Sequence, residues 1–327
     1  MEMAIDAGKK RSYVVVQDGG VVKEEGYIET TDLGFASIIP NVEGSTFIVE
    51  AGRNLYPIVE ILEQYRNCRI VVAHPTAMKL IAKAPNKTDK NDAHKLLDAY
   101  NADYLPASWL PPKEVREDRN ICSAHDFIVK QRAAIKNRIR YEAQRYGIDL
   151  GTLTKKSLKE LEISPHITLR ELAILHEDYT ERLSDFDYTI KERASLNHYA
   201  ELIDTIPGIG YSSALSIASQ IGDVHRFPSE FHFFSYIGLC PSTHQSGERE
   251  WKGHLKAGNV SLRSVLIECI WMHIAHCKDS RLTETYYRLV RRMGPKKAAV
   301  ACAKRLARII YYMLIRDKPF NPYGVGR

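Results

Sequence analysis

Residues 2–28 read EMAIDAGKKRSYVVVQDGGVVKEEGYI, and this stretch decides the fold of the N-terminal part of the chain. It contains short runs rich in β-branched and apolar side chains, which are typical of β-strands, at residues 2–6, 11–17 and 20–28. The second and third runs are joined by Asp18-Gly19-Gly20, a sequence typical of a tight hairpin turn. We therefore expect three consecutive antiparallel strands.

The residues that follow predict further strands at 46–50 and 69–72, with helices between and after them. In a sheet with the order βββαβαβα, the first and fourth strands are expected to lie side by side. Prolines then interrupt any regular element, at positions 106, 111 and 112. We predict an α/β domain at residues 1–110, a helical segment at 111–198 and a mostly helical domain at 199–327.

Residues 113–146 predict one long basic helix, because isoleucines recur at near-heptad spacing and Gly147 can end it. Its exposed cations are candidates for contact with a polyanion: Lys130, Arg132, Lys136, Arg138 and Arg140. A second apolar stripe, from Leu169 to Ile190, alternates steps of three and four residues, as in a coiled coil. This stripe predicts either an intramolecular helical hairpin or a dimerisation arm.

The composition is that of a globular protein, with 44% hydrophobic and 26% charged residues in a chain of 327. The net charge of +6 is unevenly distributed: residues 249–327 hold 17 Lys and Arg against 5 Asp and Glu, whereas residues 147–248 hold 8 against 15. Clustered cations favour a nucleic-acid partner, because they release the counterions condensed on phosphates.

The sequence has no apolar run of the length that a membrane span requires and no secretory signal at its start. Its six cysteines form no CxxC pair. We therefore expect a cytoplasmic protein with reduced thiols and no membrane partner.

Four carboxylates stand out by their positions. Asp6 ends the first predicted strand and Glu50 ends the fourth. Asp89 and Asp92 lie on one face of a predicted helix that Thr88 can cap. Since the first and fourth strands are expected to be neighbours, the four acids should cluster, and divalent cations would relieve their mutual repulsion. Mg²⁺ is the predicted cofactor, as two ions that act on a phosphate.

These acids and their neighbours resemble the motifs of a known family. AIDAGKK with Asp6, FIVEAG with Glu50, and NKTDKNDAHKLL with Asp89 and Asp92 look like the DEDD signature of RuvC-like, ribonuclease-H-type nuclease domains. Among such proteins, the chain is most similar to the DEDD-type insertion-sequence recombinases of the IS110 family, which are relatives of the Piv-type DNA invertases. The second conserved domain of that family resembles IPGIG at 206–210, IGDVHRFPS at 221–229, FSYIGLCPS at 234–242 and SGEREWKGHLKAGNVSLR at 246–263.

The resemblance, which covers nearly the whole chain, implies an RNA-guided DNA recombinase or transposase. The family's metal-binding acids fall on Asp6, Glu50, Asp89 and Asp92, and its nucleophilic serine, which becomes transiently linked to a DNA phosphate, falls on Ser246. The family also implies a structured noncoding bridge RNA that pairs with donor and target DNA, and dimers that join into a tetramer. The residues alone indicate less, because no base that could activate Ser246 is legible from the sequence.

Glycines and cations of the C-terminal part are the remaining candidates for nucleic-acid contact. IPGIG before an apolar helix resembles a helix-hairpin-helix, in which the backbone around Gly208 and Gly210 holds a phosphate, although a tight helical turn needs the same glycines. Cations near Ser246 and in the basic tail complete the set: Arg249, Lys252, Lys256, Arg263, Arg291, Arg292, Lys296 and Lys297. Aromatic residues alternate with cations in the tail, which favours contact with the DNA or RNA backbone over base-specific reading.

Two other functions stay open. A RuvC-like, structure-specific DNA nuclease would use the four acids and water and would leave hydrolysed ends. A noncatalytic nucleic-acid-binding relative would need neither the acids nor Ser246. One predicted helix also carries a set spaced like zinc ligands (Cys269, His273, His276 and Cys277), but a straight helix rarely supplies more than two ligands to a tetrahedral ion, so we expect no zinc there.

Overall fold

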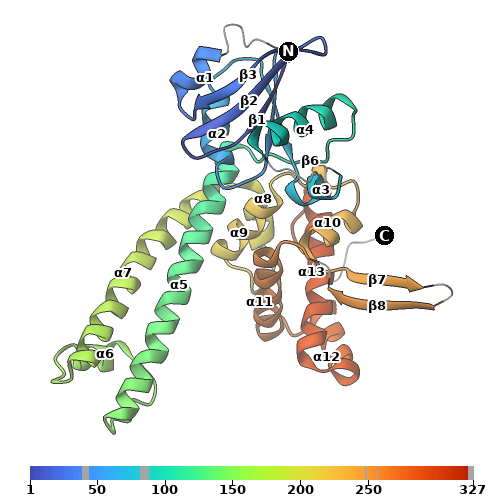
Figure 1. Ribbon diagram of the computed structural model, residues 1–327. Coiled ribbons are helices and arrows are strands. Elements are labelled where there is room, and N and C mark those ends of the chain that lie inside the picture. The colour runs from blue at the N-terminus through green and yellow to red at the C-terminus, as the bar shows by residue number, and fades with distance from the viewer. Residues whose placement is uncertain (39–43, 82–87, 247–248, 256, 323–327) are drawn as a thin grey trace. The chain divides into compact units, whose positions relative to one another are not determined.

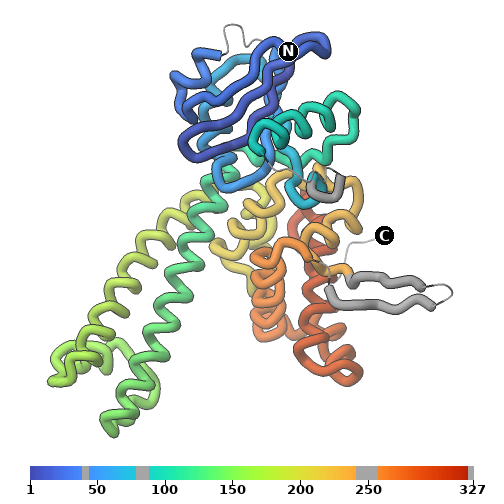
Figure 2. The backbone as a smooth tube through the Cα atoms, in the orientation of Figure 1, coloured from blue at the N-terminus to red at the C-terminus, as the bar shows by residue number. Residues whose placement is uncertain are grey.

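The computed structural model describes residues 1–38, 44–81, 88–246, 249–255 and 257–322, and within these ranges it describes the side chains of all but 79–81, 241–246 and 249–255. Figure 2 traces the backbone through these residues. The chain forms two compact units, Met1–Leu110 and Pro111–Arg327. Each unit has hydrophobic cores of its own, and each is described by itself below.

The N-terminal unit contains a mixed sheet (Figure 1) formed by β1 (Glu2–Asp6), β2 (Arg11–Asp18), β3 (Val21–Glu29), β4 (Thr46–Glu50), β5 (Arg69–Ala73) and β6 (Ala107–Ser108). The strand order is β3-β2-β1-β4-β5-β6. β1 is antiparallel to β2 and parallel to β4, and β5 is parallel to β4. The carboxyl ends of β1 and β4 therefore meet at one edge of the sheet.

The helices of this unit are α1 (Asp32–Ile38), α2 (Leu55–Leu62), α3 (Pro75–Ile81) and α4 (Asp89–Asn101). Successive side chains of a strand point to opposite faces. Ile5 and Val49 pack in one core with residues of α1 and α2. Ala4 and Ile48 pack in a second core with Leu96 and other residues of α4. The sheet is therefore covered on both faces, and α4 defines the face that matters for the candidate site.

The α/β class and the pairing of the first and fourth strands are confirmed. Each strand predicted from the sequence is found within one residue of its expected ends. Gly19 and Gly20 have φ values of +56° and +83°, the left-handed conformation that a tight hairpin turn needs. β6 was not predicted, because a strand of two residues is too short to show a period.

The C-terminal unit consists of helices and one β-hairpin (Figure 1). Its helices are α5 (Lys113–Arg145), α6 (Lys155–Glu162), α7 (Ile167–Leu196), α8 (His198–Asp204), α9 (Tyr211–Ile221), the 3₁₀ helix η1 (Val224–Arg226), α10 (Glu230–Ile237), α11 (Val260–His276), α12 (Arg281–Met293) and α13 (Pro295–Arg316). The hairpin is formed by β7 (Pro241–Ser246) and β8 (Arg249–Leu255). The predicted long helix at 113–146 is confirmed, and it ends at Arg145, just before Gly147.

α5 and α7 lie side by side and form a long arm with α6 at its tip (Figure 1). The stripe predicted as a coiled coil buries Leu169, Leu183 and Ile190 along α7. Near the base of the arm, Arg193 of α7 pairs with Asp118 of α5. The stripe therefore packs within the chain, as the first of the two interpretations predicts.

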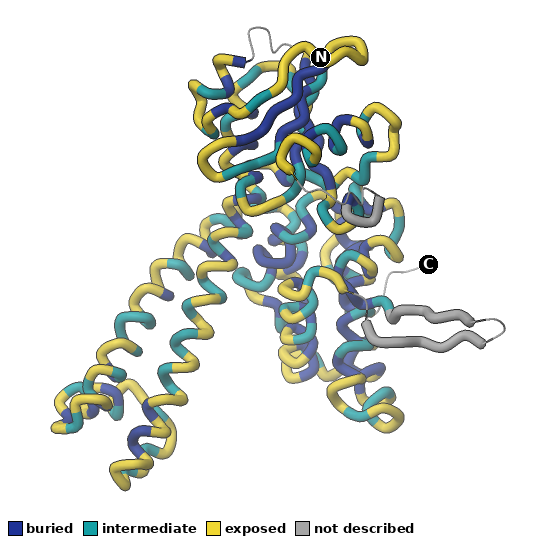
Figure 3. The backbone as a smooth tube through the Cα atoms, viewed as in Figure 1, coloured by how far each residue is buried: buried dark blue, intermediate teal, exposed yellow. Residues whose placement is uncertain are grey.

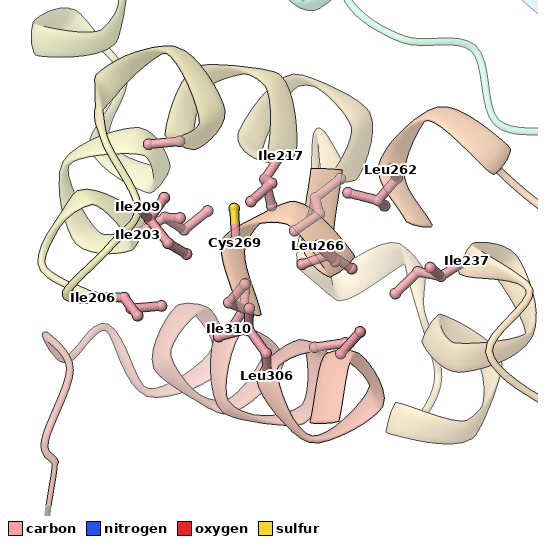
Figure 4. Close-up of a cluster of buried hydrophobic side chains, with 14 of the residues drawn as sticks. Ile203, Ile206, Ile209, Ile217, Ile237, Leu262, Leu266, Cys269, Leu306 and Ile310 are labelled. Atoms are coloured by element: carbon pink, nitrogen blue, oxygen red, sulfur yellow. The ribbon is translucent and has the colours of Figure 1, made fainter. Parts of the chain in front are cut away.

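The largest core lies among α8, α9, α10, α11 and α13. Figure 4 shows Cys269 of α11 surrounded by isoleucines that include Ile209 and Ile217, with Ile310 of α13 nearby. Figure 3 shows buried residues along α11 and α13. α13 is lined with small buried side chains such as Ala299 and Ala303, which let its neighbours approach closely. No helix in the described part of the chain combines the length and apolar character needed to cross a bilayer.

Candidate active site and nucleic-acid-binding surfaces

A row of polar side chains crosses the N-terminal sheet on the face covered by α4. Tyr27 of β3 lies opposite Tyr13 of β2, and Tyr13 lies opposite Asp6 of β1. In the parallel register Ile5 pairs with Val49, so Asp6 and Glu50 are the next residues of their strands. Because they follow Ala4 and Ile48 by two positions, both acids point to the face of α4.

The other two acids lie in the first turn of α4. Thr88 is its N-cap, and the Thr88 hydroxyl accepts a hydrogen bond from the Asn91 backbone N–H at 3.2 Å, which confirms the predicted cap. Asp89 is exposed and accepts a hydrogen bond from the Tyr27 hydroxyl at 3.1 Å. Asp92 pairs with Lys95 Nζ at 2.6 Å. Two negative side chains in a first helical turn are also favoured by the helix dipole.

The edge strand β3 holds this turn of α4 in place. The carboxylate of Glu25 accepts hydrogen bonds from Lys90 and binds His94 Nε2 at 2.6 Å. These contacts lower the pKa of Glu25 below its usual value, the contact with Lys90 contributing most. The pKa of Tyr27 is raised, chiefly because its hydroxyl donates to the Asp89 carboxylate, with smaller effects from burial and from the charge of Asp6. Both β3 side chains therefore interact with the helix start that carries the acids.

The donor set suits a hard divalent cation, because it consists of carboxylate oxygens alone. The sheet brings Asp6 and Glu50 together, and α4 begins over the same face with Asp89 and Asp92. Within the described residues, however, no three His, Cys, Asp or Glu side chains are arranged closely enough to hold a metal ion. Asp89 and Asp92 instead bind Tyr27 and Lys95, and these partners compete with a cation for their oxygens.

Ser246 is the last residue of β7, at the turn of the β7–β8 hairpin, where it lies opposite Arg249 in the register. Lys252 lies opposite Thr243 further down the hairpin. The side chains of Ser246, Arg249 and Lys252 lie outside the described residues, as does the whole of Lys256. The backbone thus places the predicted serine and one predicted cation together at the tip.

The base of this hairpin is clamped by contacts that the sequence did not predict. Gly258 lies so close to Gly238 that an added Cβ would be 2.5 Å from the Gly238 nitrogen. The Asn259 amide donates to Gln220 Oε1 at 2.6 Å and to the Tyr236 hydroxyl at 3.1 Å. Arg263, predicted to bind nucleic acid, donates to the Gly238 carbonyl at 3.1 Å. These contacts join the residues before the hairpin to those after it and tie both to α9 and α10.

The IPGIG sequence forms the turn between α8 and α9, as a helix-hairpin-helix does. Gly208 has φ +87°, and its missing Cβ leaves room for the backbone of α11, since a Cβ would lie 2.5 Å from the His273 nitrogen. Gly210 is exposed at the N-cap of α9 with φ −100° and open space around it. Close packing therefore explains Gly208, whereas Gly210 is the residue that can face a phosphate.

His273, one of the residues with zinc-like spacing, is buried and engaged by the protein. Its Nδ1 contacts the Pro207 carbonyl and its Nε2 contacts the Ser280 hydroxyl, both at 2.7 Å. Burial lowers the pKa of His273. The Cys269 thiol is also buried, and burial raises its pKa to about 11. Packing and hydrogen bonding account for both residues.

The cations predicted on α5 differ in their surroundings. Lys130 and Arg140 are exposed, whereas Arg132 and Lys136 are half-buried. Arg138 pairs with the buried Glu142 at 2.6 Å, and the same carboxylate pairs with Arg145 at 3.3 Å, so one negative charge is shared by two arginines. The four cations predicted near the turn between α12 and α13 are exposed: Arg291, Arg292, Lys296 and Lys297.

A depression between α12 and α13, which we call the α12–α13 groove, concentrates further arginines. One part, about 520 Å³ in volume, is lined by Arg281, Arg288, Arg305 and Arg308 among others. A second part, about 490 Å³ in volume, shares Arg281, Leu282 and Ile309 with the first and adds Tyr312, Arg316 and Lys318. The sequence showed the interleaved cations of this region but not the groove, which forms only when two helices pack.

Comparisons with known proteins identify relatives over most of the chain. Residues 3–146 match a family described as a transposase of the DEDD IS110 type, and residues 200–288 match the transposase IS116/IS110/IS902 family. The first range contains the four acids and the second contains Ser246.

Individual relatives agree with these matches. The transposase for insertion sequence element IS1111A of Coxiella burnetii is 30% identical over 250 residues, which are 72% of this chain and 69% of that protein. The transposase for insertion sequence element IS1328 of Yersinia enterocolitica is 27% identical, over 72% of this chain and 74% of that protein. A pilin gene-inverting protein of Moraxella lacunata is 26% identical, over 91% of this chain and 88% of that protein.

Proposed function

Because the chain belongs to the IS110 family of insertion-sequence transposases, and is thus an enzyme that acts on DNA, we propose that it is an RNA-guided recombinase that cuts and exchanges DNA strands with the help of Mg²⁺. The observation that carries the proposal is the meeting of the carboxyl ends of β1 and β4, with α4 beginning over the same face. This arrangement supports a RuvC-like site built from Asp6, Glu50, Asp89 and Asp92.

In this proposal, the four carboxylates hold Mg²⁺, which supplies Lewis-acid chemistry at a DNA phosphate. Asp89 and Asp92 would hold the cations in place of their contacts with Tyr27 and Lys95. Lys95 has a flexible side chain that can swing away. The Glu25 contacts to Lys90 and His94 meanwhile keep the start of α4 over the sheet.

Ser246 supplies the nucleophile of the proposed reaction. Its Oγ forms a bond to the phosphorus of a DNA phosphodiester, and the bond from that phosphorus to one strand oxygen breaks, so that the strand leaves with a free hydroxyl. The hydroxyl of a second strand then attacks the same phosphorus and restores the serine. The position of Ser246 at the tip of a hairpin supports this role, because the tip can reach into a DNA substrate. Arg249, beside it in the register, is suited to stabilise the charge on the phosphate.

The proposed partners are donor and target DNA and a structured noncoding bridge RNA. The backbone contacts are assigned to cations of α5 and of the segment from the hairpin to α13, and to the turn before α9: Lys130, Arg132, Lys136, Arg138, Arg140, Gly208, Gly210, Arg249, Lys252, Lys256, Arg263, Arg291, Arg292, Lys296 and Lys297. The proposed assembly is a dimer that forms a tetramer on DNA. Exposed apolar side chains on the arm, such as Phe127 and Leu175, support a role of the arm in that assembly.

A strand-exchange assay with the native flanking DNA tests the proposal. Asp6→Asn and Ser246→Ala should each reduce exchange to background, because one removes a metal-binding charge and the other removes the nucleophile. The matched controls are Asp18→Asn, an exposed acid at the end of β2, and Ser261→Ala, an exposed serine in the first turn of α11; both should retain normal exchange.

The reaction products distinguish the proposed recombinase from the alternative functions. A protein–DNA adduct that disappears in Ser246→Ala supports the serine intermediate, whereas normal exchange by that variant refutes it. Hydrolysed ends without an adduct indicate a nuclease that uses the acids and water. RNA that copurifies with the protein is sequenced in parallel, and random cellular RNA in place of one discrete transcript contradicts RNA guidance.

A further inference from the structure

The α12–α13 groove brings cations from two helices to face one another. Arg281 and Arg288 are seven residues apart on α12 and so lie on one face of that helix. Arg305 comes from α13, which packs against α12 and lines the other side of the groove. All three arginines are exposed, while the groove floor includes the buried Leu282 and Thr285. The guanidinium groups therefore stand around an open, solvent-facing depression.

The charges of the groove are incompletely balanced by the protein. Arg308 forms a bidentate pair with Glu230, with both N–O distances at 2.9 Å. In the described part of the chain, Arg281, Arg288 and Arg305 form no ion pair, and Glu284 is the one acid that lines the groove. Like charges brought into one depression repel one another, and a bound anion relieves that repulsion. An anionic ligand is thus favoured over a neutral one.

The length of the groove points to a polymer. Its second part continues from Arg281 past Tyr312 to Arg316 and Lys318. The Arg316 guanidinium lies 5.3 Å from the centroid of the Tyr312 ring. Cations along a backbone track together with an aromatic or guanidinium surface for stacking are the features by which proteins bind single-stranded nucleic acid. A base pair in a duplex cannot use such a surface, because its faces are already stacked.

We propose that the α12–α13 groove binds a single strand of nucleic acid, with Arg288 and Arg305 on one phosphate and a base stacked at Tyr312 and Arg316. This inference rests on the proposed function, in which an RNA and separated DNA strands must be held during exchange. It adds a specific site to that function, because the shared phosphodiester chemistry admits either RNA or DNA.

Binding is measured by fluorescence anisotropy with labelled 12-nucleotide RNA and DNA strands and with a duplex of the same sequence, in EDTA so that no strand is cut. The test variant is R288A/R305A. The matched control is K155A/K156A, which removes two exposed positive charges from α6. Both pairs are exposed, so the fold should be retained, which thermal unfolding followed by circular dichroism verifies.

The expected loss follows from counterion release. Each phosphate neutralised on a single strand contributes about 0.7 to the slope of log K against log salt, so loss of the one phosphate that both arginines hold lowers the slope by about 0.7. At 0.15 M salt this corresponds to roughly fourfold weaker binding. The Y312L variant should weaken single-strand binding at least severalfold without changing the salt slope, because stacking carries no charge. K155A/K156A should bind as the wild type does.

Each other result overturns the inference. Equal affinities of the wild type and R288A/R305A refute the groove but leave the proposed function standing. A wild type that binds no single strand contradicts both. An equal loss for the duplex refutes the single-strand assignment. If inorganic phosphate, at matched ionic strength, lowers the affinity of the wild type for the strand to that of R288A/R305A, the groove is a site for a free anion.

Discussion

Gly208→Ala should destabilise the C-terminal unit. The variant tests whether close helix packing or phosphate binding requires a glycine at this position. The φ value of +87° is in the region that L side chains rarely adopt. The added Cβ would lie 2.5 Å from the His273 nitrogen and 2.6 Å from the Met272 carbonyl carbon. Both are backbone atoms of α11, which cannot rotate away as a side chain can. The turn or the helix must therefore move.

The expected magnitude combines two costs. A non-glycine residue in the left-handed region costs about 1–2 kcal/mol, and overpacking of a well-packed site costs about 1–3 kcal/mol. The free energy of unfolding should therefore fall by roughly 2–5 kcal/mol. Gly210→Ala is the matched control, since it changes the same turn at φ −100° with no atom within 4 Å of the new Cβ. The loss of a glycine at the N-cap costs at most about 1 kcal/mol.

Hydrogen exchange of the full chain measures this difference locally. Under conditions where exchange reports the opening free energy, a loss of 2 kcal/mol makes amide exchange roughly 30-fold faster, since each 1.4 kcal/mol is tenfold. Peptides from α9 and α11 should show this acceleration in Gly208→Ala and much less in Gly210→Ala, with peptides from β1 and β4 as an internal reference. Equal exchange in the two variants would refute the packing argument.

Four further outcomes follow from the structure. Tyr27→Phe removes the hydroxyl that competes with a cation for Asp89 and keeps the ring, so the Mg²⁺ concentration for half-maximal strand cleavage should fall about 2- to 10-fold, as expected for one lost hydrogen bond. Saturating Mg²⁺ should slow hydrogen exchange of β1, β4 and the start of α4, by about tenfold at ten times the dissociation constant, and Asp6→Asn should abolish this protection. Because burial lowers the pKa of His273, the unfolded chain binds a proton below about pH 6.5 that the folded chain does not bind. The free energy of unfolding should therefore decrease as pH falls below about 6.5, and the decrease should be smaller in His273→Gln. Urea titrations at pH 7.5 and 5.5 measure this difference. Iodoacetamide should alkylate the partly exposed Cys68, Cys240 and Cys277 in the native protein. Burial raises the pKa of Cys122 to about 12 and that of Cys269 to about 11. Mass spectrometry should therefore find these two cysteines modified only after unfolding.

The sequence predicted the N-terminal sheet well because its signals are local. Alternating runs define the strands, the Asp18-Gly19-Gly20 turn sets the hairpin, and Thr88 marks the start of α4. The neighbouring ends of β1 and β4 follow from the strand order alone. The placement of Asp6 and Glu50 could therefore be predicted before any coordinates.

Contacts between distant segments could not be predicted in this way. Glu25 binds Lys90 and His94, which are 65 and 69 residues further along the chain, and no periodicity connects them. The role of Gly208 could not be predicted either, because a phosphate-binding turn and a close approach of a helix both require a glycine. The stripe on α7 likewise specifies an apolar seam without specifying whether the partner helix belongs to the same chain.

The two units pose opposite electrostatic problems, and this contrast links the candidate site to the groove. In the N-terminal unit, Asp6 and Glu50 end adjacent strands and place two acidic side chains side by side. In the C-terminal unit, Arg288 and Arg305 face one groove and need negative charge. The protein provides partial compensation in each place, through Lys95 for Asp92 and through Glu230 for Arg308. In the proposed function, nucleic acid with its divalent cations would supply charge of opposite sign in both places, since its phosphates suit the arginines and its cations suit the acids. A recombinase of the proposed kind, which would hold polynucleotide strands while metal ions act on a phosphate, would therefore have a physical reason to keep like charges together in each place until its substrate binds.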